Sequence, residues 1–359
     1  MLVLAYFMKP ISIKSVSGKY KVYFSNDFEK TLQNKNLKNS HLLVDRNIWN
    51  LYRNKIKNKY LSTKIITAKE ANKSLEEVIK YIKFLLKNNI HKNQSITVIG
   101  GALVQDVGSF TAHILLRGIN WIFVPTTILA MADSCIGSKS GINVGEYKNQ
   151  VGSFHAPVAI YICPEFIQTL PESEIVNGIG EILKHGLIKG GTIFEKITEE
   201  VKNIRNLRVA GEVIYQSLLI KKQIIEKDEL EKNVRKLLNY GHTFGHALEG
   251  YTDHKMAHGI GVLIGMDLAN FISLKEKIMS TSNFNKIHNY IFPYISTYMV
   301  KVTDYNKYMK FLSRDKKATE GELNALLSER IGKVKIVRIK LDTKLKNYIK
   351  EYFNTYARR

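Results

Sequence analysis

The sequence predicts a two-part fold, with an α/β half built on a parallel sheet followed by an all-α half. In the first half, short β-branched runs alternate with helical patterns. After about residue 165, apolar residues recur at helical spacing instead. The 359 residues are enough for two domains of ordinary size. We therefore expect one domain over residues 1–165 and a second over residues 166–359.

Four strands are expected in the first half, at residues 41–45, 62–67, 95–101 and 119–127. A helix is expected over residues 74–89, and a helical stretch runs from the third strand to Arg117. Such alternation indicates a doubly wound parallel sheet, which binds its ligands beyond the carboxyl ends of the strands. The residues expected at those ends are Asp45, Gly100, Gly101, Thr126 and Thr127.

The second half is expected to be helical throughout. Apolar residues follow helical spacing in residues 174–188, 217–230, 239–251 and 261–274. A short strand pair near residues 333–339 is the one exception that the pattern allows.

The composition excludes several classes of protein. The formal net charge is +22, which attracts anions such as phosphorylated metabolites. Acids interleave with the lysines, so most of the charge is expected on solvated helix faces. The two cysteines form no CxxC pair, which argues against a disulfide framework and favours a reduced cytoplasmic setting. No apolar run approaches the ~20 residues of a membrane span. We expect neither nucleic acid nor a membrane as partner.

Two histidines lie four residues apart in the segment GHTFGH. His242 and His246 would share one face of a helix, with Cβ atoms roughly 5–6 Å apart. His258 follows twelve residues later, and Glu181 lies on another expected helix. One carboxylate and two imidazoles with an open position form a common catalytic zinc set. Hydrogen-bonded helix histidines would show the same spacing, because this is not the HExxH signature.

Two further segments carry polar or glycine-rich patterns. In IGGALVQD, glycines end a strand before a helix, where backbone N–H groups can approach a pyrophosphate. A plain strand-to-helix turn explains that pattern equally well. Asp133, Lys139, Lys148 and Asn149 lie in loop-like, Gly/Ser-rich sequence that could hold a phosphorylated, hydroxylated ligand. A solvated loop with surface lysines is the alternative.

Six ordered motifs join these signals. They are GG-x(4)-D, RG-x(5)-VPTT-x(3)-AM-x-DS-x(2)-G-x-K-x-GIN, KN-x(2)-G-x-F, E-x(2)-KHG, LN-x-GHTFGHA-x-E and HG-x(6)-GM. Together they closely resemble the 3-dehydroquinate synthase family, from roughly Asp45 to Gly332. The resemblance implies a Rossmann-like NAD-binding domain, a helical metal- and substrate-binding domain, and a homodimer. It also implies bound NAD⁺ and a divalent ion, usually Zn²⁺, with Co²⁺ as the alternative.

The resemblance also assigns roles to individual residues. The metal ligands would be Glu181, His242 and His258, with His246 as the catalytic histidine. The NAD-contacting positions would be Asp45, Glu70, Lys73, Gly100, Gly101, Asp106, Thr126 and Thr127, with Lys148 nearby. The substrate-contacting positions would be Arg117, Asp133, Lys139, Asn149, Lys184, Lys221, Arg235 and Asn239, with one or both of Lys316 and Lys317.

The implied reaction converts 3-deoxy-D-arabino-heptulosonate 7-phosphate into 3-dehydroquinate and phosphate, a step of the shikimate pathway. NAD⁺ would oxidise one substrate hydroxyl, with the metal as Lewis acid. The new ketone would acidify the adjacent C–H, so that phosphate leaves by β-elimination. Reduction by the resulting NADH, ring opening and an aldol-type closure would complete a net phosphate-lyase reaction.

Four positions depart from the family's pattern. Ala102 replaces the third glycine of a triple glycine, and Gln105 replaces the glycine before Asp106, where it could crowd the backbone's approach to a pyrophosphate. Ile260 stands where a glutamate usually follows the HG of the third ligand, so another group would have to orient the ligand ring. Tyr147 replaces a glycine before KN.

Several alternatives remain at this level. The sister cyclases, 2-deoxy-scyllo-inosose and 2-epi-5-epi-valiolone synthases, act on sugar phosphates without a carboxylate, whereas Asn239, Arg235 and Lys221 keep the carboxylate-binding pattern. A net oxidoreductase of the metal-dependent glycerol dehydrogenase class would lack the lysine-rich substrate loops. A nucleic-acid-binding module or a catalytically impaired homologue would also fit the net charge of +22 or the loss of glutamate at Ile260.

Overall fold

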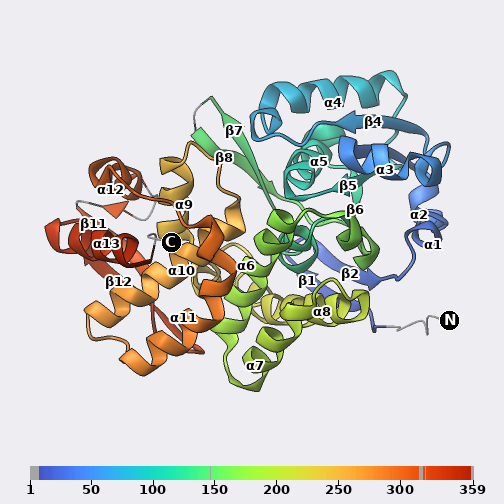
Figure 1. Cartoon of the computed structure of the whole chain (residues 1–359). Coiled ribbons are helices and arrows are strands. Elements are labelled where there is room, and N and C mark those ends of the chain that lie inside the picture. The colour runs from blue at the N-terminus through green and yellow to red at the C-terminus, as the bar shows by residue number, and fades with distance from the viewer. Residues whose placement is uncertain (1–7, 146, 315–317, 320, 357–359) are drawn as a thin grey trace. The chain divides into compact units, whose positions relative to one another are not determined.

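The computed structural model of the chain describes residues 8–145, 147–314, 318–319 and 321–356. The chain forms two compact units (Figure 1). The first unit extends to Leu170 and also contains Ile204–Leu230, and the second contains Pro171–Asn203 and everything from Glu231 onward. The backbone therefore passes from one unit to the other three times. The assignment of separate NAD-binding and metal-binding roles to two domains divided at residue 165 stays a prediction.

A seven-stranded sheet forms the centre of the first unit. Its strands in chain order are β1 (Ile11–Ser15), β2 (Gly18–Phe24), β3 (Ser40–Asp45), β4 (Ser62–Ile66), β5 (Ser95–Gly100), β6 (Asn120–Pro125) and β9 (Ala159–Ile162). Their order across the sheet is β1-β2-β9-β6-β5-β3-β4. Only β1 and β2 pair antiparallel, and every other neighbouring pair is parallel. The predicted parallel sheet and its four strands are confirmed, while β1, β2 and β9 were not anticipated.

Burial explains why the sequence predicts the central strands so clearly. All six residues of β3 are buried, as are five of the six in β5 and in β6. Parallel strands covered on both faces are apolar along their whole length. The helices of this unit are α1 (Phe28–Leu32), α2 (Lys35–Lys38), α3 (Arg46–Ile56), α4 (Leu75–Lys87), α5 (Ala102–Ile114) and α8 (Leu207–Ile225).

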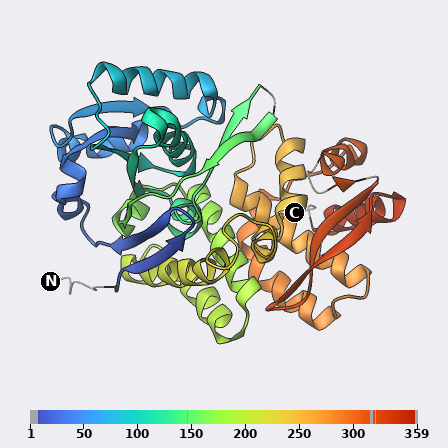
Figure 2. The same ribbon diagram turned by 180° about the vertical axis from the view of Figure 1, so that it is seen from behind.

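The Gly/Ser-rich segment after residue 138 is an antiparallel hairpin, and the expectation of a loop was wrong. It consists of β7 (Lys139–Val144) and β8 (Tyr147–Phe154), seen in green in Figure 2. A Cβ atom at Gly152 would lie 2.1 Å from the carbonyl oxygen of Ser140. The glycine that suggested a loop instead lets two strands approach closely.

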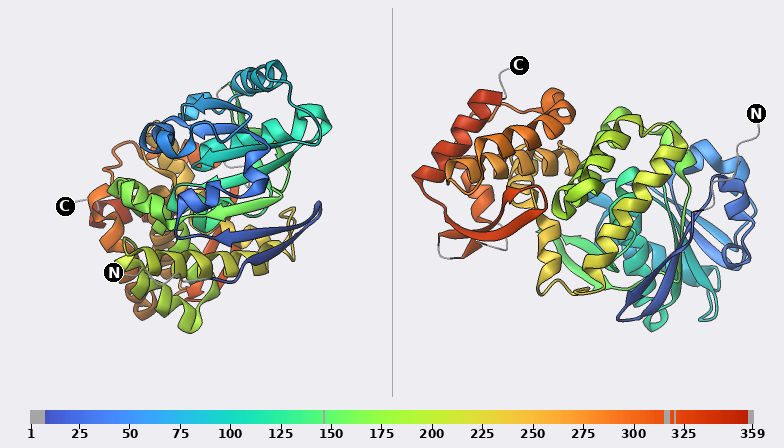
Figure 3. Two further views of the ribbon diagram at one scale, coloured as in Figure 1. Left: turned by 90° about the vertical axis from the view of Figure 1, so that its right-hand side faces the viewer. Right: turned by 90° about the horizontal axis from the view of Figure 1, so that it is seen from below.

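The second unit is mainly helical, as predicted, and adds a small sheet. Its helices are α6 (Glu172–Lys189), α7 (Gly191–Glu200), α9 (His242–Tyr251), α10 (His258–Lys275), α11 (Thr281–Ile295), α12 (Tyr305–Ser313) and α13 (Thr343–Tyr356). The strands β10 (Ala318–Thr319), β11 (Glu322–Arg330) and β12 (Lys333–Lys340) form an antiparallel sheet beside α13, in red in Figure 3. The strand pair predicted near residues 333–339 is therefore present.

Helix α10 is the centre of the second unit. Residues 259–273 are all buried, and α6, α9, α11, α13 and β11 pack against them. A helix that is apolar all round is expected to lie inside a protein core. Within the described residues, no helix is both long enough and apolar enough to cross a membrane.

Glycines bring α6 and α9 unusually close to α10. A Cβ atom at Gly180 would lie 2.3 Å from the carbonyl oxygen of Gly259, and one at Gly245 would lie 2.6 Å from that of Gly261. No side chain fits at either crossing, because real Cβ contacts are longer. The backbones therefore meet directly, and short side chains near these crossings can reach a common point.

Candidate functional site

Three helices of the second unit contribute the predicted metal ligands. His242 is the first residue of α9, His258 is the first residue of α10, and Glu181 lies near the middle of α6. The predicted helix carrying His242 and His246 is confirmed. Because the three helices touch at their glycines, these side chains meet although up to 77 positions separate them, from 181 to 258.

The donor atoms converge on the Glu181 carboxylate. The distance from Glu181 Oε1 is 3.5 Å to His258 Nε2 and 3.8 Å to His242 Nε2. Two ligands of a tetrahedral zinc ion with bonds of about 2.1 Å lie about 3.4 Å apart, so this spacing suits one cation. The rings of His242, His246 and His258 also lie together, with donor atoms within 4.8 Å of one another. Glu181 and His246 are thus both near enough to be the third donor.

Hydrogen bonds on the far side of each ring set its orientation. His258 Nδ1 donates to Glu249 Oε1 at 2.9 Å, and His242 Nδ1 donates to the carbonyl oxygen of Tyr240 at 3.3 Å. Both Nε2 atoms are thereby turned toward Glu181, as ligand histidines usually are by such partners. Ile260 is buried in the α10 core, and Glu249 supplies the acceptor that the sequence analysis required.

Glu249 was not among the predicted site residues. It is the glutamate of the quoted motif GHTFGHA-x-E, seven positions after His242, and so lies two helical turns along α9. That spacing was the signal that could have found it.

The site carries strong negative character. Burial alone would lower the pKa of His258, but the carboxylates of Glu249 and Glu181 outweigh it and raise that pKa to about 10. Glu181 is fully buried and its Oε2 pairs with the ammonium of Lys184, which is also buried. The carboxylates of Glu181 and Glu249 therefore make this site negative, and a divalent cation bound there would offset their charge.

In the first unit, five of the predicted cofactor residues, Asp45, Gly100, Gly101, Thr126 and Thr127, lie at the carboxyl ends of β3, β5 and β6. Asp45 ends β3 and caps α3, its Oδ1 accepting from the backbone N–H of Asn47 at 2.7 Å. Burial raises the pKa of Asp45. Gly100 ends β5 and Gly101 is the N-cap residue before α5, so the two glycines form the predicted strand-to-helix turn.

Thr126 and Thr127 directly follow β6. The backbone N–H of Thr126 donates to the carbonyl oxygen of Gly100 at 3.0 Å, which ties the end of β6 to the end of β5. A Cβ atom at Gly101 would lie 3.1 Å from the Thr127 side chain. These threonines and glycines therefore meet at one edge of the sheet, as the sequence predicts.

The charged cofactor candidates pair with one another. Lys73 Nζ lies 2.5 Å from Asp106 Oδ2, and Lys148 Nζ lies 3.5 Å from Glu70 Oε1. Asn143 also donates to Glu70 Oε1, at 2.9 Å. Burial would raise the pKa of Glu70, but the Asn143 hydrogen bond and the charges of Lys73 and Lys148 lower it overall.

Four predicted substrate residues also lie in the first unit: Asp133 after β6, Lys221 on α8, Lys139 in β7 and Asn149 in β8. Asp133 and Lys221 form a largely buried ion pair, with Lys221 Nζ 2.8 Å from Asp133 Oδ1. Lys139 begins β7, where its ammonium lies 5.8 Å from the centre of the Phe154 ring. The backbone N–H of Asn149 donates to Asn143 Oδ1 at 3.0 Å.

Arg117 stands apart from these residues. It precedes β6 and therefore lies at the amino end of that strand, whereas Thr126 and Thr127 follow its carboxyl end. Its φ of +60°, together with a φ of +51° at Leu116, places two residues in the left-handed region. Lys92 Nζ donates to the carbonyl oxygens on either side of Arg117, those of Leu116 and Gly118.

The remaining substrate candidates belong to the second unit. Arg235 is buried in the short helix η6 (Val234–Asn239), and the Asn239 amide donates to Glu231 Oε1. Lys316 and Lys317 lie outside the described residues.

Two of the departures from the family's pattern have clear places in the structure. Gln105 is buried, and its amide bonds to Ser134 rather than extending toward the strand-to-helix turn. Tyr147 is exposed at the start of β8.

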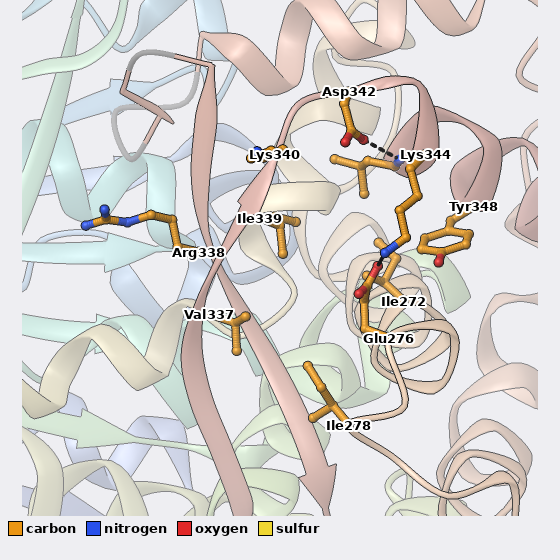
Figure 4. Close-up of a pocket in the computed structure, with 11 residues that line it drawn as sticks. Ile272, Glu276, Ile278, Val337, Arg338, Ile339, Lys340, Asp342, Lys344 and Tyr348 are labelled. Carbon is orange, nitrogen blue, oxygen red and sulfur yellow. Dashed lines mark hydrogen bonds and ion pairs between the residues drawn. The ribbon is translucent and has the colours of Figure 1, made fainter.

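A cavity of about 250 Å³ lies in the second unit (Figure 4). It is lined by the end of α10, by β12 and by the start of α13, with Lys344 pairing to Glu276 at 2.7 Å. Its lining residue Ile272 is about 21 Å along α10 from His258. None of the predicted site residues lines this cavity.

Two solved structures share this architecture. A 2-deoxy-scyllo-inosose synthase complexed with carbaglucose-6-phosphate, NAD⁺ and Co²⁺ is 20% identical, with a TM-score of 0.85 over 97% of this chain and 100% of that chain. The 2-epi-5-epi-valiolone synthase ValA from Streptomyces hygroscopicus subsp. jinggangensis, with NAD⁺ and Zn²⁺ bound, is 21% identical, with a TM-score of 0.83 over 98% of this chain and 99% of that chain. The chain thus has the fold of the sugar-phosphate cyclases.

Comparison of sequences identifies the family of this chain within the class of sugar-phosphate cyclases. Residues 63–177 match the N-terminal domain of 3-dehydroquinate synthase, and residues 178–318 match its C-terminal domain. The 3-dehydroquinate synthase of Dictyoglomus thermophilum is 34% identical over 92% of this chain and 94% of its own length. The chain belongs to the 3-dehydroquinate synthase family.

Proposed function

We propose that this protein is a 3-dehydroquinate synthase, a carbon–oxygen lyase of the shikimate pathway. It would convert 3-deoxy-D-arabino-heptulosonate 7-phosphate into 3-dehydroquinate and phosphate, using NAD⁺ and a divalent metal. One observation carries this proposal. In a chain that belongs to this family, His242, His258 and Glu181 converge on a point that suits one cation.

The residues present fit the metal. Two neutral imidazole nitrogens and one carboxylate oxygen form a catalytic zinc set, and Glu249 and the Tyr240 carbonyl orient the rings. When bound, the metal supplies Lewis-acid polarisation of a substrate hydroxyl, and NAD⁺ supplies a hydride acceptor that later returns the hydride. Zn²⁺ and Co²⁺ are the ions found in the two related cyclases.

The fit to NAD⁺ rests on the edge formed by β3, β5 and β6. The backbone N–H groups at the start of α5, next to Gly100 and Gly101, would favour a pyrophosphate. Asp45 at the end of β3 would accept from a ribose hydroxyl, as acidic residues do in this class of sheet. Glu70, Lys73, Asp106, Thr126, Thr127 and Lys148 complete the proposed cofactor set.

The chain's own residues would bind the substrate's two anionic groups and move protons. We assign Lys139, Lys184 and Arg117 to the phosphate, and Lys221, Arg235 and Asn239 to the carboxylate. Lys184 and Lys221 now pair with Glu181 and Asp133, and their positive charge would be shared with the arriving anion. His246 is exposed beside the two ligand histidines and would accept and return a proton.

The position of Arg117 favours a homodimer. It lies at the amino edge of the sheet, opposite the edge that carries the proposed cofactor residues. We infer that Arg117 would reach a bound substrate from a second copy of the chain. We also propose a cytoplasmic location, in keeping with the two unpaired cysteines, which are buried.

Phosphate release tests the proposal. The purified chain is mixed with NAD⁺ and the heptulosonate phosphate, with and without a chelator, and released phosphate and NADH are followed. We expect phosphate release without net NADH accumulation, loss of release with chelator, and recovery with added Zn²⁺ or Co²⁺.

Two outcomes would contradict the proposal. Turnover of glucose 6-phosphate in preference to the heptulosonate would assign the chain to the 2-deoxy-scyllo-inosose type of cyclase. The absence of any chelator-sensitive phosphate release would identify a catalytically impaired homologue.

A further inference from the structure

A π-helical turn follows the strand that ends at the proposed cofactor edge. It spans Ala130–Ser134, and the backbone N–H of Cys135 donates to the carbonyl oxygen of Ala130 at 3.1 Å, five residues back. Such turns are rare and often occur at functional sites. This one carries Asp133, which the family resemblance assigns to the substrate-contacting positions.

Three side chains hold successive carbonyl groups of this turn. Ser217 Oγ donates to the carbonyl oxygen of Ala132 at 3.0 Å, and Lys221 Nζ donates to that of Asp133 at 2.7 Å. Both donors lie on α8. The third donor comes from α5, on which Gln105 Nε2 donates to the carbonyl oxygen of Ser134 at 2.7 Å.

The contact between Gln105 and Ser134 is reciprocal. Ser134 Oγ donates to Gln105 Oε1 at 2.6 Å, so the amide is engaged at both its oxygen and its nitrogen. Gln105 is only 4% exposed, and a buried amide left without these partners would be costly. A glycine, the usual residue here in the family, could form neither bond.

The first turns of α5 therefore tie down two segments that carry proposed substrate residues. Gln105 holds the π-helical turn with Asp133, while the adjacent Asp106 accepts from the backbone N–H of Gly141 in β7 at 3.1 Å. These neighbouring side chains point to different segments, so α5 fixes the spacing between them.

We propose that Gln105 is a positioning residue of the active site: it locks the π-helical turn so that Asp133 keeps its place against Lys221. This inference rests on the proposed function for the roles of Asp133 and Lys221, and Gln105 itself need not contact substrate or cofactor. It also replaces the expectation that Gln105 crowds a pyrophosphate, since the amide is directed to Ser134.

The test compares two glutamines that each donate to a backbone carbonyl. Gln105→Met keeps the length of the side chain but loses both hydrogen bonds. Gln168→Met is the control for loss of such a bond at an exposed position, because Gln168 Nε2 donates to the carbonyl oxygen of Arg205 at 2.7 Å and Gln168 is not a proposed site residue. The full chain is assayed for kcat/KM with the heptulosonate phosphate, for the Kd of NAD⁺, for Tm, and for amide hydrogen exchange over residues 130–135.

We expect Gln105→Met to lower kcat/KM between about tenfold and a hundredfold, because small displacements of substrate-holding groups are costly. Amide exchange in the turn should accelerate, and the Kd of NAD⁺ should stay within about twofold of the wild-type value. Gln168→Met should leave kcat/KM and exchange in the turn unchanged even if its Tm falls by a similar amount. Ser134→Ala removes one of the two hydrogen bonds and should lower kcat/KM by a smaller factor. If Gln105→Met does not fold, the result for Ser134→Ala tests the proposal in its place.

Gln105→Glu tests the positioning role through the pH dependence of activity, which a merely structural role of Gln105 would leave unchanged. A protonated glutamate can donate to Ser134 and accept from it, whereas an ionised one cannot donate. Activity of Gln105→Glu should therefore approach that of the wild type at low pH and fall as pH rises through the pKa of the new carboxyl, in a way absent from the wild-type pH profile.

Each failure has its own signature. Wild-type protein that releases no phosphate would defeat the proposed function, while faster exchange in Gln105→Met would still support the lock. Wild-type turnover with an unchanged kcat/KM in Gln105→Met would overturn the inference. So would tighter NAD⁺ binding in Gln105→Gly, because that result would show that the amide crowds the cofactor.

Discussion

The two units differ in how many of their charged site residues are already paired with one another. In the helical unit, Glu181 Oε2 pairs with Lys184, but two imidazoles face its Oε1, an arrangement that a cation would complete. In the sheet unit, acids and lysines already form pairs, such as Lys73 with Asp106 and Lys221 with Asp133. The first arrangement is prepared for an ion, whereas the second must exchange existing partners for those of a ligand. Substitutions should therefore have larger effects in the helical unit.

The largest expected effect follows from removing the carboxylate donor. Glu181→Gln should lose bound metal and lower turnover by about a thousandfold, the rate equivalent of several kcal/mol of Lewis-acid stabilisation. His246→Ala should keep a full equivalent of metal and still turn over slowly. Metal content by elemental analysis and phosphate release by colorimetry check both variants. The reverse pattern, with metal lost from His246→Ala and kept in Glu181→Gln, would make His246 the third donor.

The glycine crossing between α6 and α10 should give the next largest effect. A Cβ atom in Gly180→Ala would lie 2.3 Å from the carbonyl oxygen of Gly259, so the helices must separate, at roughly 1–3 kcal/mol of unfolding free energy. Metal affinity should fall with it. Gly186→Ala on the same helix is the matched control, since its Cβ would meet side chains rather than backbone, the Phe194 ring at 3.3 Å and Ile197 at 3.6 Å. Urea denaturation measures the unfolding free energy of each variant, and chelator competition measures its metal affinity. Equal losses of metal affinity in the two variants would show that the α6–α10 crossing is not what positions the ligands.

A smaller effect is expected at the residue that orients His258. Glu249→Gln removes the charged acceptor while keeping the shape of the side chain, and it should weaken metal binding by about ten- to a hundredfold. Glu199→Gln on α7, an exposed glutamate paired with Lys202, should leave metal affinity unchanged. Competition with a metal-indicator dye distinguishes the two, and an unaltered affinity in Glu249→Gln would show that ring orientation does not depend on this contact.

The smallest effect should come from the paired charges of the sheet unit. The pKa of Glu70 is lowered from 4.5, so its stabilising contribution is present above pH 4.5 and is lost as pH falls through the lower folded-state pKa. Its side chain is 40% exposed, so screening should keep that contribution below about 1 kcal/mol. Urea titrations of wild type and Glu70→Gln should differ near neutrality and converge below pH 4.5. A difference that grows on acidification would contradict the sign.

The sequence was most informative where burial leaves little choice of residue. The apolar runs of β3, β5 and β6 predicted the parallel sheet because both faces of those strands are covered. The spacing of His242 and His246 likewise predicted a shared helix face, since four residues make about one turn.

What could not be predicted depends on partners distant in the sequence. The sequence of the β7–β8 hairpin predicts a loop because it is rich in Gly and Ser. In the fold, these small residues let the two strands pack closely together. The pairing of Glu249 with His258, and that of Gln105 with Ser134, join residues on different elements. Residue type and local spacing identify donors and acceptors, but they do not say which of them meet.

The glycine crossings also bear on how such a site is lost. Every substitution at Gly180, Gly245 or Gly259 enlarges the residue, so random change there can only drive backbones apart. A descendant could therefore keep both ligand histidines and the glutamate yet have no working centre. Judging whether a homologue still binds its ion would require inspecting these smallest residues together with the ligands themselves.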